Sequence, residues 1–159
     1  MKTVKLSLLI LLTTFFAFES MGLTGQPALK MKAHRVIKRT AIVILAAHKK
    51  VKEGKVYTGD LARSIAHQKF ARKLFRKGMY VRAIHHSRRA RLLSVLAIKA
   101  NKGSEIAEAQ STAEEEELMK NSPTDDELEK ELLKEMPEAK LKDEDVITTQ
   151  PDIDLKERE

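Results

Sequence analysis

The sequence predicts an all-α protein: a small three-helix core followed by an acidic, largely disordered tail with short helices. The chain of 159 residues has six glycines, four prolines, two tyrosines, five phenylalanines and no tryptophan, so residues typical of turns and strands are scarce. Apolar residues recur three and four positions apart over residues 32–101, which is the spacing of amphipathic helices. Acidic residues gather after residue 103, where few apolar residues remain to form a core.

The N-terminal segment has the parts of a secretory signal peptide, which we predict over residues 1–22. Two lysines precede an uncharged apolar run over residues 6–18, and Ser20 and Gly22 are small residues suited to cleavage after Gly22. This run is shorter than the roughly 20 residues that span a bilayer, although an uncleaved anchor is the alternative. We expect an exported protein, in the bacterial periplasm or secreted, with no transmembrane span after cleavage.

The rest of the chain divides into two halves of opposite charge. Residues 23–103, a predicted basic helical domain, carry 21 lysines and arginines and two acidic residues. Residues 104–159 carry 7 lysines and arginines and 20 acidic residues. Self-repulsion of the basic half opposes compaction unless counter-charge lies nearby. We therefore expect an intramolecular contact between tail and core, diffuse and sensitive to salt.

Three helices are predicted in the basic domain, at about residues 32–52, 59–77 and 80–101. Either Thr58 or Asp60 is expected to cap the second helix by accepting hydrogen bonds from its free amides. The first helix carries one apolar stripe with helical spacing, formed by Ala33, Ile37, Ala41, Ile44, Ala47 and Val51.

The acidic tail is expected to have low order, with helices near residues 104–120 and 124–136. The second of these begins with a capping box between Thr124 and Glu127. It could dock on the core or on a partner, because three apolar residues lie along one edge: Leu128, Leu132 and Met136. Low hydrophobicity and many charges predict disorder in the residues that follow.

The run "HQKFARKLFRKGMYVRAIHHSRRARLL" in the second and third helices resembles a tetratricopeptide helical hairpin. The resemblance covers about 30 of the 159 residues and a single repeat unit. It rests on small residues that allow close helix packing, on a turn glycine and on large apolar or aromatic neighbours: Phe70, Ala71, Leu74, Gly78, Tyr80, Ala83 and Ala90.

The resemblance implies an inner groove lined by Gln68, Arg72 and Arg76. In that family such positions hold extended peptides, sometimes by their carboxylate ends. Arginine suits this role because its planar guanidinium can donate two parallel hydrogen bonds to a carboxylate. The alternative is that these arginines only keep an exposed helix face hydrated.

A basic ridge is predicted on the third helix. Its members recur at helical spacing and would present one column of positive charge: Arg82, His85, His86, Arg88 and Arg89. Such a column could contact phosphates, acidic sugars, lipopolysaccharide or an acidic protein segment. Nucleic acid is not expected as the partner, because stacking aromatics are missing from the ridge and the protein is expected to be exported. Arg91 lies on the apolar side, where its stem could pack or its head could pair with an acid of the tail.

The sequence offers little for catalysis or for cofactors. Cysteine is absent, which removes thiol nucleophiles and thiolate metal sites. His85 and His86 are neighbours that point in different directions on a helix, and no His-x-x-x-His pair occurs. Ser64, Ser87 and Ser94 lack an acid placed to orient a histidine base. We expect no catalytic residues, no metal and no cofactor.

The leading hypothesis is a non-enzymatic, exported helical protein that binds an anionic partner, such as an acidic protein segment or peptide, through its basic face. The tail would compete for that face or neutralise it. The second hypothesis is an envelope-associated protein that binds an anionic membrane or polysaccharide surface. A metal-binding or enzymatic role ranks third.

Overall fold

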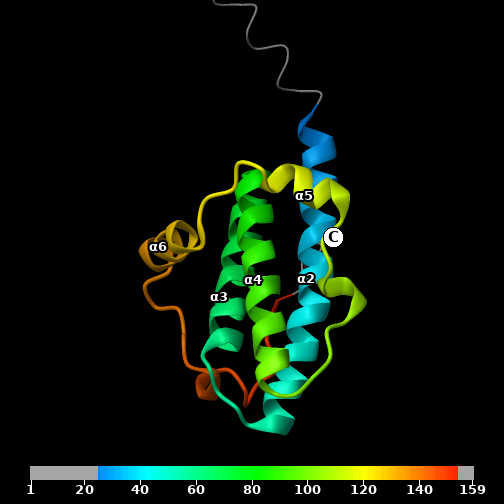
Figure 1. Cartoon of the computed structure of the whole chain (residues 1–159). Helices are drawn as coiled ribbons and strands as arrows, with labels where there is room; N and C mark the ends of the chain where they lie inside the picture. The colour runs from blue at the N-terminus through cyan, green and yellow to red at the C-terminus, as the bar shows by residue number, and fades with distance from the viewer. Residues whose placement is uncertain (1–24, 154–159) are drawn as a thin grey trace, which may run out of the picture.

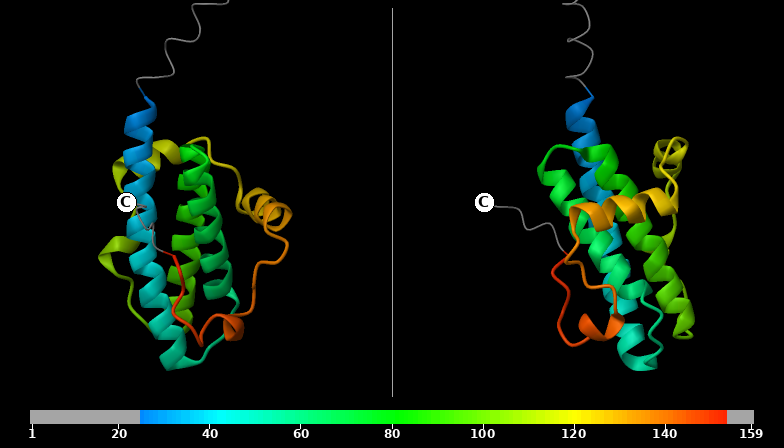
Figure 2. Two further views of the ribbon diagram at one scale, coloured as in Figure 1. Left: turned by 180° about the vertical axis from the view of Figure 1, so that it is seen from behind. Right: turned by 90° about the vertical axis from the view of Figure 1, so that its left-hand side faces the viewer.

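The computed structural model describes residues 25–153, which form helices and no strands, and the all-α prediction is confirmed (Figure 1). The predicted signal peptide and the last six residues of the chain lie outside the described residues. The core consists of α2 (Gln26–Gly54), α3 (Asp60–Arg76) and α4 (Tyr80–Ala100). Successive helices run in opposite directions and lie side by side, so each contacts the other two (Figures 1 and 2).

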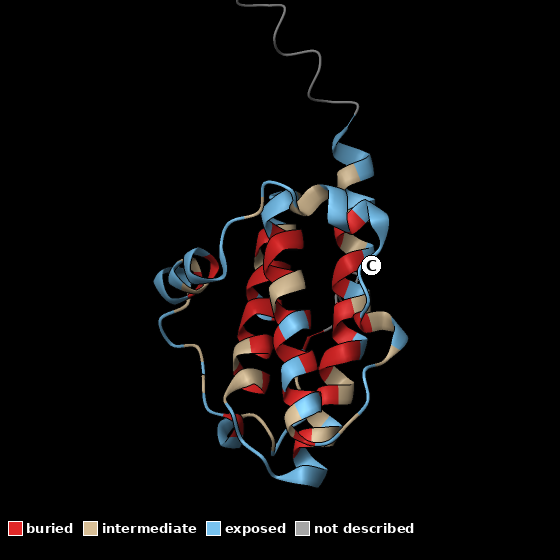
Figure 3. Cartoon of the chain, in the orientation of Figure 1, coloured by how far each residue is buried: buried red, intermediate tan, exposed pale blue. Residues whose placement is uncertain are grey.

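Helix α2 begins earlier than the sequence pattern predicts, at Gln26 instead of near Lys32. Pro27 lies in its first turn, where the fixed φ of proline favours the helix and its missing amide hydrogen costs nothing. All six residues of the predicted apolar stripe of α2 are buried. The facing surfaces of the three helices are buried in the same way (Figure 3), and they form a core rich in alanine, isoleucine and valine.

A row of polar residues also lies inside the bundle. The Gln68 side-chain amide donates to the Ile37 carbonyl at 2.8 Å and accepts from the Ser87 hydroxyl at 3.0 Å. The Ser64 and Ser94 hydroxyls lie 2.6 Å apart. All these side chains are fully buried, and a buried polar group is costly unless it is hydrogen-bonded. The paired groups therefore fix the register of α3 against its neighbours.

The N-terminus of α3 is capped by a residue distant in sequence, in addition to one of the two residues expected to cap it. The Thr58 hydroxyl accepts from the Asp60 amide at 3.3 Å, as one of the two alternatives proposed. The buried carboxylate of Asp143 accepts from the amides of Gly59 and Ala62, both at 2.9 Å. A carboxylate in this position satisfies free amides and favours the positive end of the helix dipole.

Residues 104–153, which we call the acidic belt, pass around the core (Figures 1 and 2). The belt contains η1 (Ala107–Ala109), α5 (Ala113–Met119), α6 (Asp125–Glu135) and η2 (Asp143–Asp145). The first two helices lie over α2 and α4, and α6 crosses α3 and α4. The segment after η2 returns between α2 and α3.

The belt contains short helices within both ranges that the sequence predicts, whereas the low order predicted for the tail stays a prediction. Its first predicted helix is divided into η1 and α5, whereas α6 begins at the expected Thr124–Glu127 capping box. Most of the belt surface is exposed (Figure 3). The belt lies on the core through a few buried side chains spread along its length: Ala109, Glu115, Leu128, Leu132, Asp143 and Ile153. The average composition of the segment does not reveal single buried residues that are spaced along a polar chain.

Candidate functional site

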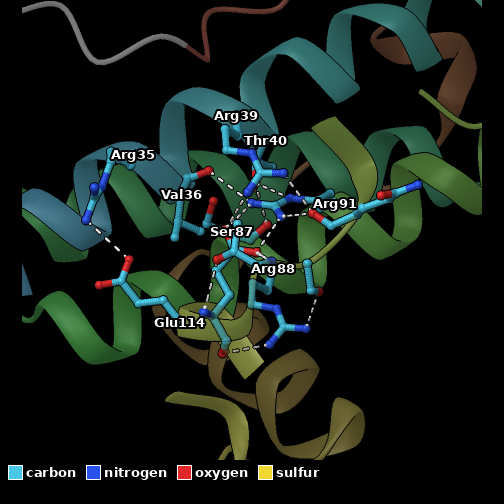
Figure 4. Close-up of polar contacts among 12 residues, drawn as sticks. Arg35, Val36, Arg39, Thr40, Ser87, Arg88, Arg91 and Glu114 are labelled. Carbon is cyan, nitrogen blue, oxygen red and sulfur yellow. Dashed lines mark hydrogen bonds and ion pairs between the residues drawn. The ribbon is translucent and has the colours of Figure 1, made fainter. Parts of the chain in front are cut away.

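The most deeply buried ion pair joins the core to the belt. Arg91 of α4 and Glu115 of α5 are 2% and 3% exposed. The guanidinium donates to both carboxylate oxygens, with Nη1–Oε2 at 2.8 Å and Nη2–Oε1 at 3.0 Å. Arg91 Nε also donates to the Thr40 hydroxyl at 3.2 Å, which places the guanidinium between α2 and α4 (Figure 4). This two-pronged geometry is the strongest form of arginine–carboxylate pairing.

Two hydrogen bonds with Thr112 hold Glu115 in place within the belt. It occupies the third position of α5, where its carboxylate accepts from the Thr112 amide at 3.3 Å and its own amide donates to the Thr112 hydroxyl at 3.2 Å. Burial raises the pKa of Glu115, but the hydrogen bonds and charge of Arg91, with smaller help from Thr112 and Arg39, bring it below its ordinary value. The carboxylate is therefore ionised at neutral pH.

Further arginines surround the start of α5 (Figure 4). Arg88 donates to the Glu115 carbonyl at 3.1 Å and to the Ser111 hydroxyl at 2.8 Å. Arg35 of α2 pairs with Glu114 at 3.2 Å, and Arg39 lies 3.5 Å from the Glu115 carboxylate. Two core helices thus share one short acidic helix, which partly neutralises the repulsion between them.

The arginines at the two ends of the basic ridge contact α6. Arg89 Nη1 lies 2.6 Å from Asp125 Oδ2, and Arg82 forms a hydrogen-bonded ion pair with Glu131. The Asp125 side chain is 61% exposed and that of Arg82 is 46% exposed. Ion pairs this accessible to water contribute little to stability individually. They orient α6 rather than anchor it.

Beneath α6, two buried histidines contact each other. His67 Nδ1 and His86 Nδ1 lie 3.0 Å apart, with neither residue exposed. His67 Nε2 lies 3.1 Å from Glu129 Oε2, and His86 Nε2 lies 3.5 Å from Glu131 Oε2. The histidine pair thus has a carboxylate of α6 at each end.

Burial keeps both histidines neutral. Desolvation, followed by the charges of Arg89 and Arg63, lowers the pKa of His67 to about 3. Desolvation and the neighbouring His67 lower the pKa of His86 to about 4. We assign the tautomers from the shorter carboxylate contact: His67 Nε2–H donates to Glu129, so that His86 Nδ1–H donates to His67 Nδ1. This tautomer leaves His86 Nε2 as an acceptor facing Glu131, in keeping with the absence of a hydrogen bond at that nitrogen.

The basic ridge is therefore not the exposed column that the sequence predicts. His86 is fully buried and His85 is 6% exposed, with its Nε2 3.3 Å from the Leu118 carbonyl. Desolvation also lowers the pKa of His85, against the effect of that carbonyl. The positive charge of the ridge comes from Arg82, Arg88 and Arg89, and all three have partners in the belt.

The three residues that the tetratricopeptide resemblance places in a groove lie in three different environments in the structure. Gln68 is buried against α2. Arg72 is 7% exposed, donates to the Asp152 carbonyl at 2.6 Å and lies 3.4 Å from its carboxylate. Only Arg76 is exposed, and its Nε donates to the Arg72 carbonyl at 3.3 Å. Helix α2 and the last turn of the belt thus occupy the face that the resemblance assigns to a peptide.

Sequence reasoning left two parts of this site unassigned. The sequence predicts Arg91 on the apolar side of α4 with two alternatives, and pairing with an acid of the tail is the one observed. Its partner Glu115 has a recognisable sequence pattern, because Thr112 and Glu115 have the spacing of a capping box. The His67–His86 contact joins residues 19 positions apart on two helices, and nothing in the local sequence indicates it.

Metal coordination finds no geometric support in this region. Within residues 25–153, no group of three or more histidine, aspartate or glutamate side chains has an arrangement that could hold a metal ion. The histidine pair directs its Nδ1 atoms at each other, so these nitrogens are not available for a shared ligand.

We expect the Arg91–Glu115 pair to stabilise the fold far more than its exposed neighbour does. Glu115→Gln keeps the shape and the capping function but leaves the buried guanidinium without a counter-charge. The free energy of unfolding should fall by about 3 kcal/mol or more. Glu114→Gln removes an exposed partner of Lys32 and Arg35 and should cost no more than about 1 kcal/mol. Chemical denaturation of both variants measures the difference, and equal losses would contradict this assignment.

We also expect stability to fall in mild acid because of the histidine pair. Histidines of the unfolded chain take up protons below their ordinary pKa of 6.5, whereas His67 and His86 do so only near 3 and 4. The unfolded state therefore binds more protons, and the free energy of unfolding should fall by about 1–3 kcal/mol between pH 6.5 and 5. Replacing both histidines with glutamine should flatten this slope. An unchanged slope in denaturation curves would show that the pair is not its source.

Comparisons with protein-family models, with curated proteins and with solved structures found no match for this chain. The resemblance of residues 67–93 to a tetratricopeptide hairpin therefore stays a prediction.

Proposed function

We propose that this chain is a non-enzymatic, exported interaction protein that binds an acidic protein segment on the face of α3 and α4 now covered by α6. One observation supports the proposal above all: two arginines and a neutral histidine of that face already hold acidic side chains of the belt. Arg89 holds Asp125, His67 holds Glu129, and Arg82 holds Glu131. A face that binds three carboxylates from its own chain has the chemistry to bind them from another.

The two α-helices of the belt differ in how readily they could be released from the core. At α5, Glu115 is buried against Arg91, and separating them would expose two desolvated charges. At α6, the Arg89–Asp125 and Arg82–Glu131 pairs each have one solvent-exposed partner, and the buried residues of the helix are Leu128 and Leu132. Helix α6 is therefore the exchangeable part of the belt. It would act as a tethered competitor for the partner, as the opposite charges of the two halves suggest.

A non-enzymatic role is part of this proposal. The buried serines of the core bond each other or the protein scaffold: Ser64 lies 2.6 Å from Ser94, and Ser87 donates to Gln68. The histidine pair contacts carboxylates and no hydroxyl group. Within this part of the described core, these serines and histidines do not place a hydroxyl group beside an imidazole base.

A second candidate function, binding to an anionic membrane or polysaccharide surface, is favoured by a different part of the molecule. Met31, Met79 and Val81 are 64%, 42% and 39% exposed around the N-terminal end of α2. A cleft of about 430 Å³ lies there, lined by Pro27, Lys30, Met31, His34, Arg35 and Phe75. Among the helices of residues 25–153, none has the length and apolar character needed to cross a bilayer. Binding of this kind would be peripheral.

The proposed function is tested by opening α6 in the full-length protein. Leu128→Ala with Leu132→Ala removes two buried anchors, each worth about 2–5 kcal/mol, whereas Leu133→Ala alters an exposed neighbour. We expect the opened variant to bind poly-L-glutamate at least about tenfold more tightly than the Leu133→Ala control, because closure of α6 no longer competes. Fluorescence anisotropy measures the affinity, and high salt should weaken it.

Adding Arg82→Ala and Arg89→Ala to the opened variant should abolish this binding. Binding that survives these substitutions, or an opened variant no better than the control, would contradict the proposal. Attachment of the unaltered protein to anionic phospholipid vesicles, lost on Met31→Ser, would favour the second candidate.

A further inference from the structure

Helix α6 presents two leucines to the core with the spacing of one helix face. Leu128 and Leu132 are 3% and 0% exposed, and Leu132 belongs to the same cluster as Phe70 and Leu74 of α3. Four residues of helix advance about 6 Å along the axis, whereas four residues of extended chain advance about 13 Å. The apolar contact therefore fits a helix and not an extended peptide.

The acidic contacts follow the same geometry. Asp125, Glu129 and Glu131 reach Arg89, His67 and Arg82 respectively. In a helix these three carboxylates lie within about 9 Å along the axis, and an extended chain would spread them over about 20 Å. Helix α6 crosses α3 and α4 instead of running along them (Figures 1 and 2), so its contact surface is short.

Several residues of α6 do not contact this face. Asp126, Lys130 and Leu133 are exposed, and the Glu127 carboxylate accepts from the amide and hydroxyl of Thr124 in the capping box. Capping fixes the first turn before docking, which lowers the entropy cost of ordering the segment. The contacts thus separate residues that face the core from residues that could vary.

From this pattern, and resting on the proposed function, we infer that the partner presents a short, capped, amphipathic acidic helix with the pattern Asp-x-x-Leu-Glu-x-Glu-Leu. Helix α6 is the intramolecular copy of that ligand. The two leucines are buried against the core, and the acidic residues pair with Arg89, His67 and Arg82. Recognition then requires shape and spacing in addition to negative charge.

The inference is tested with synthetic peptides of residues 123–137 and the full-length protein opened by Leu128→Ala and Leu132→Ala. Four comparison peptides are used. One is scrambled and one has both leucines replaced by alanine, and these two keep the native charge. In the other two, Lys130 is replaced by proline or by alanine. Proline breaks the helix, and alanine reproduces its change in charge. We expect the native and Lys130→Ala peptides to bind at least about tenfold more tightly than the others, which is a difference of about 1.4 kcal/mol.

Equal binding of the native and scrambled peptides would overturn the helical pattern. If poly-L-glutamate still bound through Arg82 and Arg89, the proposed anion-binding function would survive that result. Failure of every peptide and of poly-L-glutamate would remove both. A second opened protein, with Asp125→Asn and Glu131→Gln, keeps both leucines and repeats the measurement should the first variant lose its helical circular dichroism.

Discussion

A guanidinium buried among three helices must have a carboxylate, and in this chain that carboxylate comes from the acidic belt. Arg91 is enclosed by α2, α4 and α5, and Glu115 is the group that neutralises it. This pair fixes the point at which the belt joins the core. The later segments of the belt, α6 and the stretch that returns between α2 and α3, follow this attachment in the chain, so their positions depend on it. The same contact brings negative charge to a basic domain that holds only two acidic residues of its own.

The belt combines contacts of two strengths, and this difference links structure to function. Buried contacts at Glu115 and Asp143 satisfy groups that would be costly to leave unpaired. Between them, α6 is held by two leucines and by solvent-exposed ion pairs. A segment that contains no buried ion pair, between two attachments that do bury charged groups, can leave its site without unfolding the core. Such a segment can regulate access to the surface beneath it, and the tether makes it an efficient competitor.

Local patterns were enough to predict the three core helices, the apolar stripe of α2 and the capping box of α6. These depend on residues within a few turns of one another. The path of the belt could not be predicted in the same way, because its buried residues are single positions separated by long polar stretches. Their partners are also distant in sequence: Glu115 lies 24 positions from Arg91, and Asp143 lies 84 positions from Gly59. The charge of the basic ridge was overestimated for a related reason. A histidine is basic or neutral according to its burial, and the burial of His85 and His86 is decided by tertiary packing.

The arrangement of belt and core is tested most directly by a distance between them. The chain contains no cysteine, so two can be introduced and labelled without interference, at the exposed positions Leu133 of α6 and Lys38 of α2. Pulsed electron–electron double resonance on this protein, at neutral pH and about 0.15 M salt, measures the distribution of distances between the two spin labels. A belt seated on the core predicts one narrow peak. A broad distribution typical of a flexible chain would contradict the seated belt and the competition that depends on it.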